Sequence, residues 1–180
     1  MATSVPAVIL AAGASSRLGE PKAMVQWNGE TLVGRAVRLL KEVGCNPIIV
    51  VTRQELLFEI TMVCKDASVV VNNEPEEGRT GSIQVGLMAL MSDKGRKPRK
   101  VLIAPVDRCG WNTETIETIV QHKGDVSPVP SGHPLLLSSI DAVLSSPKDK
   151  PLRDVISVSK VDAPGVYMNI DNPEDLEDLQ

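Results

Sequence analysis

The sequence predicts an α/β fold of three layers, in which a mostly parallel, Rossmann-like sheet is covered by helices on both faces. Short, continuous apolar runs alternate with segments of helical spacing along the 180 residues, and such runs are typical of strands buried on both faces. Hydrophobic residues make up 42% and charged residues 23% of the chain, as in an ordinary globular protein. We expect a single domain over residues 1–180.

Strands and helices alternate in the first half of the chain. Val5–Leu10 is an apolar run that ends at small residues, and a loop rich in helix breakers follows it. Thr31 is placed to cap a helix through Val43, because the apolar residues between them fall on one face and Gly44 ends the pattern. Next come a strand at Pro47–Thr52, a helix at Gln54–Val63, a strand at Ser68–Val71 and a helix at Gly81–Met91.

The second half continues the alternation. Val101–Ala104 is expected as a strand that stops at Pro105, and Asn112 as the cap of a helix to His122. There follow a short strand at Asp125–Val129, a helix at Pro134–Leu144, a strand at Gly165–Ile170 and a helix at Asn172–Leu179 with Pro173 in its first turn. Ligands of such sheets bind beyond the carboxyl ends of the strands, so we expect a site in the loops that follow Leu10, Val71, Ala104 and Ile170.

Composition excludes several classes of partner. Aromatic residues make up only 2% of the chain and the net charge is -4, which argues against stacking on single-stranded nucleic acid and against binding a polyphosphate backbone. No apolar run approaches the roughly 20 residues that span a bilayer, and Met1–Pro6 lacks the features of a signal peptide. The cysteines Cys45, Cys64 and Cys109 are scattered and odd in number, as expected of reduced thiols. We therefore expect a cytoplasmic protein with no nucleic-acid or membrane partner.

The loop after the first strand carries the strongest chemical signal. Leu10 is followed by the small residues Ala11, Ala12 and Gly13, and the cations Arg17 and Lys22 come after them. Small residues let backbone N–H groups approach a phosphate chain, and cations neutralise its charge. The spacing is neither that of a Walker loop nor that of the dinucleotide fingerprint. The residues thus favour triphosphate binding, with a plain strand-to-loop turn as the alternative.

The same loop carries a family resemblance. Leu10-Ala11-Ala12-Gly13-x-Ser15-x-Arg17-Leu18-Gly19-x-Pro21-Lys22 resembles the opening signature of nucleotidyltransferases with a glycosyltransferase-A-like fold, and within them the molybdenum cofactor cytidylyl- and guanylyltransferases. The resemblance implies the nucleotide-diphospho-sugar transferase fold. It also implies a Mg²⁺-dependent transfer of a nucleoside monophosphate from a nucleoside triphosphate to a phosphorylated acceptor such as molybdopterin, with release of pyrophosphate. A weak protein partner in a cofactor pathway is implied as well.

Two further stretches extend the resemblance around the nucleotide. Glu77–Leu87 is similar to the family loop that leads into a helix beside the base, which implies that Gly78 and Ser82 contact the nucleotide. Ala104-Pro105-Val106-Asp107 places Asp107 where the family has an aspartate that binds the metal. Cys109 stands where the family pattern has a second proline, so the match is looser after Asp107.

The C-terminal third resembles the family in two more places. Gly132 and His133 look like part of a Gly-His-Pro element on the acceptor side of the cleft, where His133 would be a positioning residue. Residues 169–176 resemble the family's closing segment. There Asp171 is the candidate second magnesium ligand and Asn169 its rival.

The resemblance also implies catalytic roles for two cations and the identity of the nucleotide. Arg17 and Lys22 would be the catalytic cations that hold the β- and γ-phosphates and stabilise the leaving pyrophosphate. Ala12 favours CTP, because Leu-Ala-Ala-Gly openings accompany the cytidylyltransferases and Leu-Ala-Gly-Gly openings the guanylyltransferases. A guanylyltransferase of the same pathway and a sugar- or polyol-phosphate nucleotidyltransferase are the alternatives. A regulatory protein that binds nucleotide without turnover is the alternative of a different class, and the change at Arg108 and Cys109 would support it.

Overall fold

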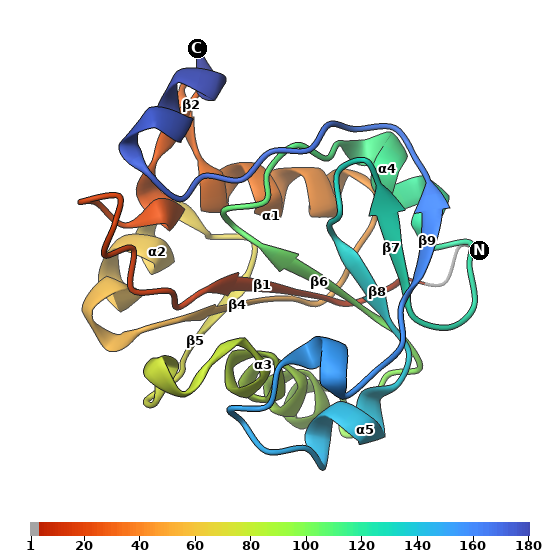
Figure 1. Cartoon of the computed structure of the whole chain (residues 1–180). Coiled ribbons are helices and arrows are strands. Elements are labelled where there is room, and N and C mark those ends of the chain that lie inside the picture. Colours follow the sequence, from red (N-terminus) through yellow and green to blue (C-terminus); the bar gives the residue numbers. More distant parts are fainter. Residues whose placement is uncertain (1–3) are drawn as a thin grey trace.

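The computed structural model describes residues 4–180 and confirms the predicted fold class (Figure 1). Its strands are β1 (Ala7–Ala11), β2 (Gln26–Trp27), β3 (Glu30–Thr31), β4 (Ile48–Thr52), β5 (Ser68–Val71), β6 (Val101–Pro105), β7 (Val126–Val129), β8 (Leu135–Leu137) and β9 (Ser159–Asp162). Its α-helices are α1 (Leu32–Glu42), α2 (Leu57–Val63), α3 (Arg79–Lys94), α4 (Thr113–Ile119) and α5 (Ile140–Leu144). Of the segment Met1–Pro6, for which no signal peptide is expected, residues 1–3 lie outside the described part.

The central sheet has seven strands in the order β5-β4-β1-β6-β8-β7-β9. The first four of these are mutually parallel. β8 is antiparallel to both β6 and β7, and β7 is parallel to β9. Strands β2 and β3 form a separate antiparallel pair. The carboxyl ends of β1 and β6, which are neighbours, therefore meet at one edge of the sheet.

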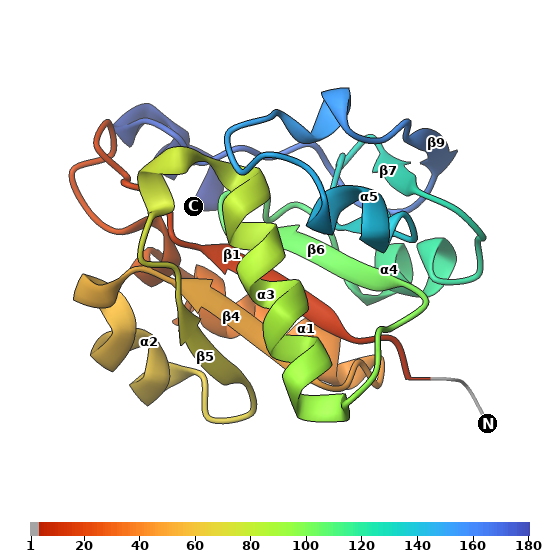
Figure 2. The ribbon, with the colours of Figure 1, turned by 90° about the horizontal axis from the view of Figure 1, so that it is seen from below.

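Helices cover both faces of the sheet (Figures 1 and 2). Helices α1, α2 and α4 lie on one face, and α3 and α5 lie on the other. Side chains alternate along β1, so that Ala7 and Ile9 pack toward α1 whereas Val8 and Leu10 pack toward α3. Burial on both faces explains why these strands are apolar throughout. Helix α3 comes so close to β1 that a Cβ atom at Gly86 would clash with Val8.

Helix α1 forms as the sequence predicts. The hydroxyl of Thr31 accepts a hydrogen bond from the backbone N–H of Gly34 at 3.0 Å, and Gly44, with φ of +83°, follows the last turn. The three cysteines are unpaired and buried, and burial raises the pKa of each thiol. Across residues 4–180, no helix has both the length and the apolar character needed to cross a membrane.

Three expectations for the second half of the chain are wrong. Leu135–Leu137 form β8 rather than the start of a helix, so helix α5 occupies only Ile140–Leu144. The segment 165–170 is not a strand, and the strand of this region is β9. The C-terminal turns over Pro173–Leu179 are 3-10 rather than α-helical. A short apolar run does not reveal its period, and β9 is a polar edge strand, which explains the first two errors.

Candidate functional site

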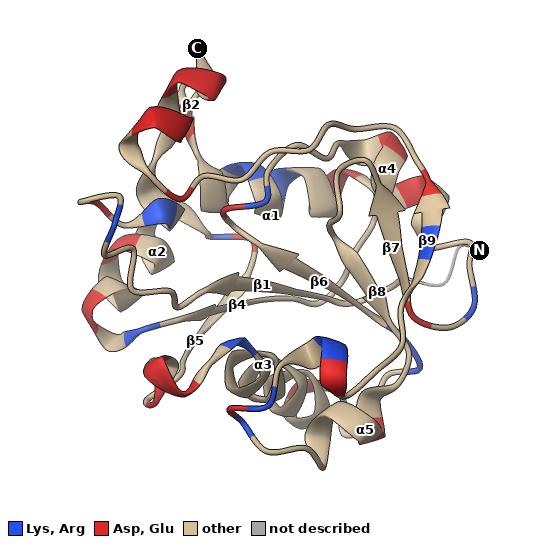
Figure 3. Cartoon of the chain, in the orientation of Figure 1, with Lys and Arg blue, Asp and Glu red and all other residues tan. Residues whose placement is uncertain are grey.

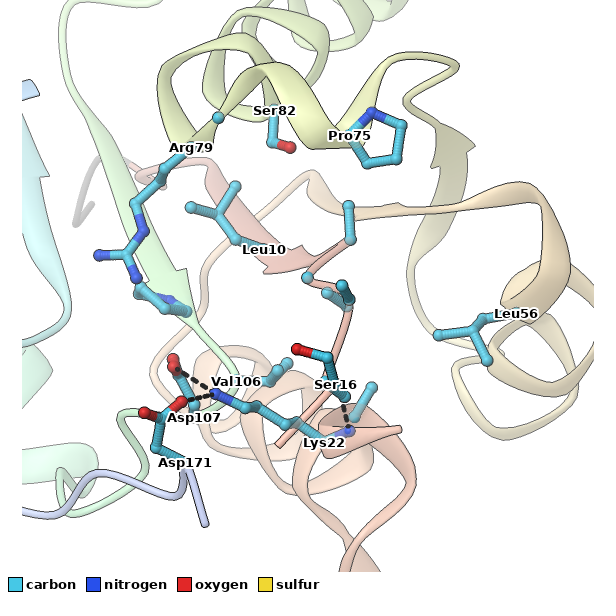
Figure 4. Close-up of a pocket in the computed structure, with 18 of the residues that line it drawn as sticks. Leu10, Ser16, Lys22, Leu56, Pro75, Arg79, Ser82, Val106, Asp107 and Asp171 are labelled. Carbon is cyan, nitrogen blue, oxygen red and sulfur yellow. Dashed lines mark hydrogen bonds and ion pairs between the residues drawn. The ribbon is translucent and has the colours of Figure 1, made fainter. Parts of the chain in front are cut away.

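A cavity of about 370 Å³ lies at the carboxyl ends of β1 and β6 (Figure 4). Segments far apart in the sequence form it, among them the loop after β1, the start of α3, the loop after β6 and Asp171, which lies just before the C-terminal turns. The sequence-predicted residues that line it are Leu10, Ala11, Ala12, Gly13, Arg17, Lys22, Gly78, Ser82, Asp107 and Asp171. The structure thus brings ten of the predicted site residues together in one place.

The loop after β1 folds back on itself and carries its cations to the cavity. Ser15 has a φ of +53°, and its carbonyl oxygen accepts a hydrogen bond from the N–H of Leu18 at 3.2 Å. The hydroxyl of Ser15 accepts a second hydrogen bond, from the backbone N–H of Lys22 at 3.0 Å. Leu18 is buried and anchors the turn. Lys22 is thereby fixed at its backbone, while its ammonium group reaches the loop after β6.

Two carboxylates converge on this ammonium group. Lys22 Nζ lies 2.6 Å from Asp171 Oδ1 and 3.4 Å from Asp107 Oδ2, and Arg17 Nη2 lies 2.8 Å from Asp171 Oδ2. The hydrogen bond from Lys22 is the main reason why the pKa of Asp171 is lowered. Figure 3 shows the acidic and basic residues meeting where the loops after β1 and β6 approach the C-terminal segment. The site is therefore a cation enclosed by two carboxylates at the mouth of a cavity.

Asp171 reaches the cavity without a strand to carry it. The backbone N–H of Ile170 donates to the carbonyl oxygen of Asp107 at 2.9 Å, and the N–H of Val166 donates to that of Gly110 at 2.8 Å. Any side chain at Gly110 would clash with the backbone of Val166, so this close approach requires glycine. The extended segment 165–170 thus runs beside the loop after β6, and the two aspartates become neighbours.

The C-terminal turns fix Asp171 from the other side. The carboxylate of Asp175 accepts hydrogen bonds from the backbone N–H groups of Asp171, at 2.8 Å, and Asn172, at 2.7 Å. These bonds lower the pKa of Asp175 and keep it ionised. Asn172 is the cap of the 3-10 turns. Asp175 therefore has a positional function.

Arg35 holds the loop after β6, and sequence reasoning did not find it. Its guanidinium group donates to the carbonyl oxygens of Cys109 and Trp111, both at 2.9 Å, and lies 4.5 Å from the centre of the Trp27 ring. A helix residue therefore closes the turn that begins at Asp107. No local pattern signals such a contact, because the partners are 74 and 76 residues apart.

The start of α3 forms the opposite wall of the cavity. Gly78, with φ of +124°, precedes Arg79, the first residue of the helix. The hydroxyl of Ser82 accepts a hydrogen bond from the side-chain amide of Asn72 at 3.0 Å, which leaves the hydroxyl proton free to donate. Asn72 directly follows β5, at one of the loops where we expect a site, although the sequence did not single it out. Figure 4 shows the Arg79 side chain extending along the wall toward the two aspartates.

The structure does not bring the residues expected on the acceptor side into this cavity. His133 lines a neighbouring cavity of about 450 Å³, together with Gly78, Arg79 and Pro105. Gly132 and Asn169 line neither of these two cavities. Burial lowers the pKa of His133 to about 4, with smaller contributions from Arg79 and Arg108. His133 is therefore a neutral imidazole at pH 7.

The described residues offer a pair of carboxylates rather than a complete metal centre. Asp107 and Asp171 approach the same cation, and within residues 4–180 no group of three or more His, Cys, Asp or Glu side chains is placed to hold a metal ion. Magnesium takes one or two carboxylates and completes its shell with phosphate oxygens and water. The pair therefore fits a divalent ion that arrives with a phosphate ligand.

Comparison with known proteins identifies the family. Residues 7–163 match the model of the MobA-like NTP transferase domain. A bifunctional IPC transferase and DIPP synthase from Thermococcus kodakarensis is 29% identical over 95% of this chain and 49% of its own length. A probable molybdenum cofactor guanylyltransferase from Opitutus terrae is 32% identical over 49% of this chain and 44% of its own length. The chain thus spans about half the length of these curated relatives.

Solved structures confirm the fold. The crystal structure of Rv0371c from Mycobacterium tuberculosis H37Rv has a TM-score of 0.79 at 20% identity, and the match covers 99% of this chain and 98% of that chain. A complex of the same protein with manganese has a TM-score of 0.76 at 17% identity, over 98% of both chains. The family model matches most of the chain, and the chain therefore belongs to the family of MobA-like NTP transferase domains.

Proposed function

We propose that this protein is a nucleotidyltransferase that uses Mg²⁺ and CTP. A phosphate oxygen of the acceptor attacks the α-phosphorus, the bond between the α-phosphorus and the bridging oxygen breaks, and pyrophosphate leaves with the electron pair. The observation that carries the proposal is the cluster of Arg17, Lys22, Asp107 and Asp171 at the mouth of a cavity walled by a small-residue loop. Membership of the NTP transferase family supports it.

The cations of the cluster have the position that phosphate binding needs. Lys22 and Arg17 are engaged by Asp171 here, and a triphosphate in the cavity would offer them oxygens of higher charge density. Both cations would then stabilise the negative charge that develops on the leaving pyrophosphate. Electrostatic stabilisation of this kind supplies most of the rate enhancement in such transfers. An acceptor phosphate is already anionic, so the reaction needs no general base from the protein. This agrees with a cavity that contains cations and carboxylates but no histidine.

A divalent ion would take the place that Lys22 Nζ occupies between the two aspartates. Asp107 and Asp171 would be its protein ligands, and it would neutralise phosphate charge and orient the α-phosphorus. The manganese complex of Rv0371c, a protein of the same fold, supports a divalent metal in general. We propose Mg²⁺ because a pair of carboxylates plus phosphate oxygens suits its octahedral shell.

Ala12 supports CTP as the nucleotide. Its side chain is 4% exposed and lines the cavity, so its methyl group narrows the space for a base. The discrimination between two substrates that one methyl group provides rarely exceeds roughly 1–3 kcal/mol, or about 10- to 200-fold. GTP is the alternative, which the molybdenum cofactor guanylyltransferases among the relatives favour. We propose molybdopterin as the acceptor, in a cytoplasmic protein, with a sugar or polyol phosphate as the other candidate.

Pyrophosphate release tests the proposal directly. The protein is incubated with Mg²⁺, molybdopterin and each of CTP, GTP, UTP and ATP, and released pyrophosphate is measured with a coupled assay. We expect release with CTP above that with GTP. Faster release with GTP would overturn the choice of base and leave the reaction class in place. Saturable nucleotide binding without release from any nucleotide, with molybdopterin and with sugar or polyol phosphates, would favour the regulatory protein.

A further inference from the structure

We propose that the exposed face of helix α2 and the adjoining edge of β5 form an interface at which a second copy of this chain docks about a twofold axis. The two elements pack against each other at one border of the molecule (Figure 2). β5 is the last strand of the described sheet on that side. The proposal concerns assembly and does not depend on the proposed function.

Helix α2 presents apolar side chains to solvent. Phe58 is 76% exposed and Met62 is 55% exposed, and Val63 is exposed as well. Residues four apart lie on the same face of a helix, so Phe58 and Met62 form one apolar strip, opposite the buried Ile60. Of the six large hydrophobic side chains that are exposed within residues 4–180, three belong to this helix of seven residues. Single exposed apolar residues are ordinary in a monomer, whereas such a cluster is typical of a contact surface.

The outer edge of β5 is suited to pairing with another strand. The N–H of Asn72 donates to the carbonyl oxygen of Thr52 at the end of β4. Because successive N–H groups of a strand alternate in direction, those of Val69 and Val71 point away from β4. Proteins commonly protect exposed edges with charged residues or proline. β9, at the opposite border of the sheet, carries a lysine and an aspartate, whereas β5 contains neither charged residues nor proline.

Charges of opposite sign lie at the two ends of the apolar strip. Glu55 and Glu59 lie at the N-terminal end of α2, and Lys65 follows its C-terminal end. Within residues 4–180, neither Glu59 nor Lys65 forms an ion pair. The Glu55 side chain is 75% exposed, and Arg53 Nε approaches it only to 3.7 Å. Asp66, next to Lys65, is already engaged in an ion pair with a lysine of α1. The helix is thus acidic at one end and basic at the other.

A twofold axis at the middle of α2 uses both the apolar strip and the charges. In an antiparallel pair of helices centred on Ile60, Phe58 meets Met62 of the other copy, because both lie two residues from the centre. Glu55 and Lys65 both lie five residues from the centre, so each glutamate faces the lysine of the other copy. A parallel pair would place like charges together. Because one surface supplies both halves of the match, as a twofold interface requires, we infer a second copy rather than an unrelated partner.

The same axis would also run the two β5 strands antiparallel, so that Val69 exchanges hydrogen bonds with Val71 of the other copy. This interface borders the cavity of about 370 Å³. Leu56, which precedes α2, lines that cavity, and Asn72, which follows β5, donates to Ser82 in its wall. The second copy would therefore contact the elements that carry this side of the cavity.

Sedimentation velocity without nucleotide tests the interface. We expect a reversible dimer between about 1 µM and about 1 mM protein, since one short helix and one strand edge lie at or below the roughly 1,200 Å² that a stable interface buries. Met62→Glu should weaken dimerisation about tenfold or more, because it places a charge in the apolar centre. Met88→Glu is the matched control, because Met88 lies on α3 and is 53% exposed, close to the 55% of Met62.

Charge reversal and amide exchange test the orientation. Glu55→Lys should weaken dimerisation about fivefold, because two symmetric ion pairs become repulsive. Adding Lys65→Glu should restore it, because the pairs form again with their signs exchanged. In the wild type, exchange of the Val69 and Val71 N–H groups, followed by NMR, should slow as the protein concentration rises.

The outcomes bear on assembly alone. A protein that stays monomeric at every concentration, or equal effects of Met62→Glu and Met88→Glu, would overturn the interface. A double charge variant that does not regain dimerisation, or exchange at Val69 and Val71 that is independent of concentration, would overturn the twofold arrangement. Circular dichroism checks that each variant folds. Since no nucleotide or metal is present, failure of these tests leaves the proposed function untouched.

Discussion

Replacing Lys22 with methionine is expected to improve the affinity of the apo protein for a divalent cation. The ammonium group of Lys22 contacts both Asp171 and Asp107, at 2.6 and 3.4 Å, and so occupies the place proposed for the metal. Methionine keeps the length and the apolar stem of the side chain but removes its charge. The carboxylates would then be free to bind the ion without a competitor.

The structure sets the size of this effect. Arg17, Lys22, Asp107 and Asp171 carry a summed charge of zero, which becomes about −1 in the variant. The Lys22 side chain is only 15% exposed, so water screens its interaction less than that of a surface pair. A charge-assisted hydrogen bond is worth about 10- to 100-fold in an equilibrium constant. Because Arg17 still holds Asp171, we expect the lower end, about tenfold.

Manganese serves as the paramagnetic probe. Free Mn²⁺ is measured by electron paramagnetic resonance during titration of the wild type, Lys22→Met and Lys41→Met without nucleotide. Lys41 is the control, because it forms an exposed ion pair with Asp66 at 2.7 Å, away from the cavity. Added CTP should tighten Mn²⁺ binding to the wild type, since the phosphates draw Lys22 away and supply ligands. Equal Mn²⁺ affinity of wild type and Lys22→Met would refute the reasoning.

Three further predictions concern the surroundings of the cluster. Asp107→Asn should retain the fold, checked by circular dichroism, but lower Mg²⁺-dependent pyrophosphate release about 100-fold, and undiminished release would exclude Asp107 as a ligand. Arg35→Leu should lower the free energy of unfolding in urea by on the order of 2 kcal/mol, because the carbonyl oxygens of Cys109 and Trp111 lose their donor; a change as small as that of Arg99→Gln, a control at an exposed arginine, would contradict the structural function of Arg35. His133 has a folded pKa of about 4, below the ordinary unfolded value of about 6.5, so the unfolded state binds more protons between these values and stability should fall as pH drops from 6.5 to 4. The free energy of unfolding, measured by urea denaturation at pH 7 and at pH 4.5, should decline less between these pH values in His133→Gln than in the wild type. An equal decline in the two proteins would assign it to other groups.

The parallel half of the sheet could be predicted from the sequence because its strands are buried on both faces. The apolar runs of β1, β4 and β6 are long enough to be distinctive, and that of β6 stops at Pro105. The antiparallel half could not be predicted in the same way. The three leucines of β8 form too short a run to show a period, and β9 is an exposed edge strand with two charged residues.

The candidate site also has one part that could be predicted from the sequence and another part that could not. The loop after β1 could be predicted as a unit, because its small residues and cations are adjacent in the sequence. Contacts between distant segments left no local signal, among them Arg35 with the carbonyl oxygen of Cys109 and Asn72 with Ser82. Asp171 could be predicted because residues 169–176 resemble a family segment. Its position, however, depends on the hydrogen bond from the backbone N–H of Ile170 to the carbonyl oxygen of Asp107 rather than on a strand.

Calorimetric titration of CTP in the presence of Mg²⁺ tests most directly whether the cavity binds a nucleoside triphosphate through its cations. The wild type is compared with the double variant Arg17→Ala, Lys22→Ala, whose folding is checked by its thermal transition. We expect saturable binding to the wild type and a loss of about 100-fold or more in the variant, because two charge-assisted contacts to phosphate are removed. Equal affinity of the two folded proteins would contradict the account, as would a wild type that binds neither CTP nor GTP.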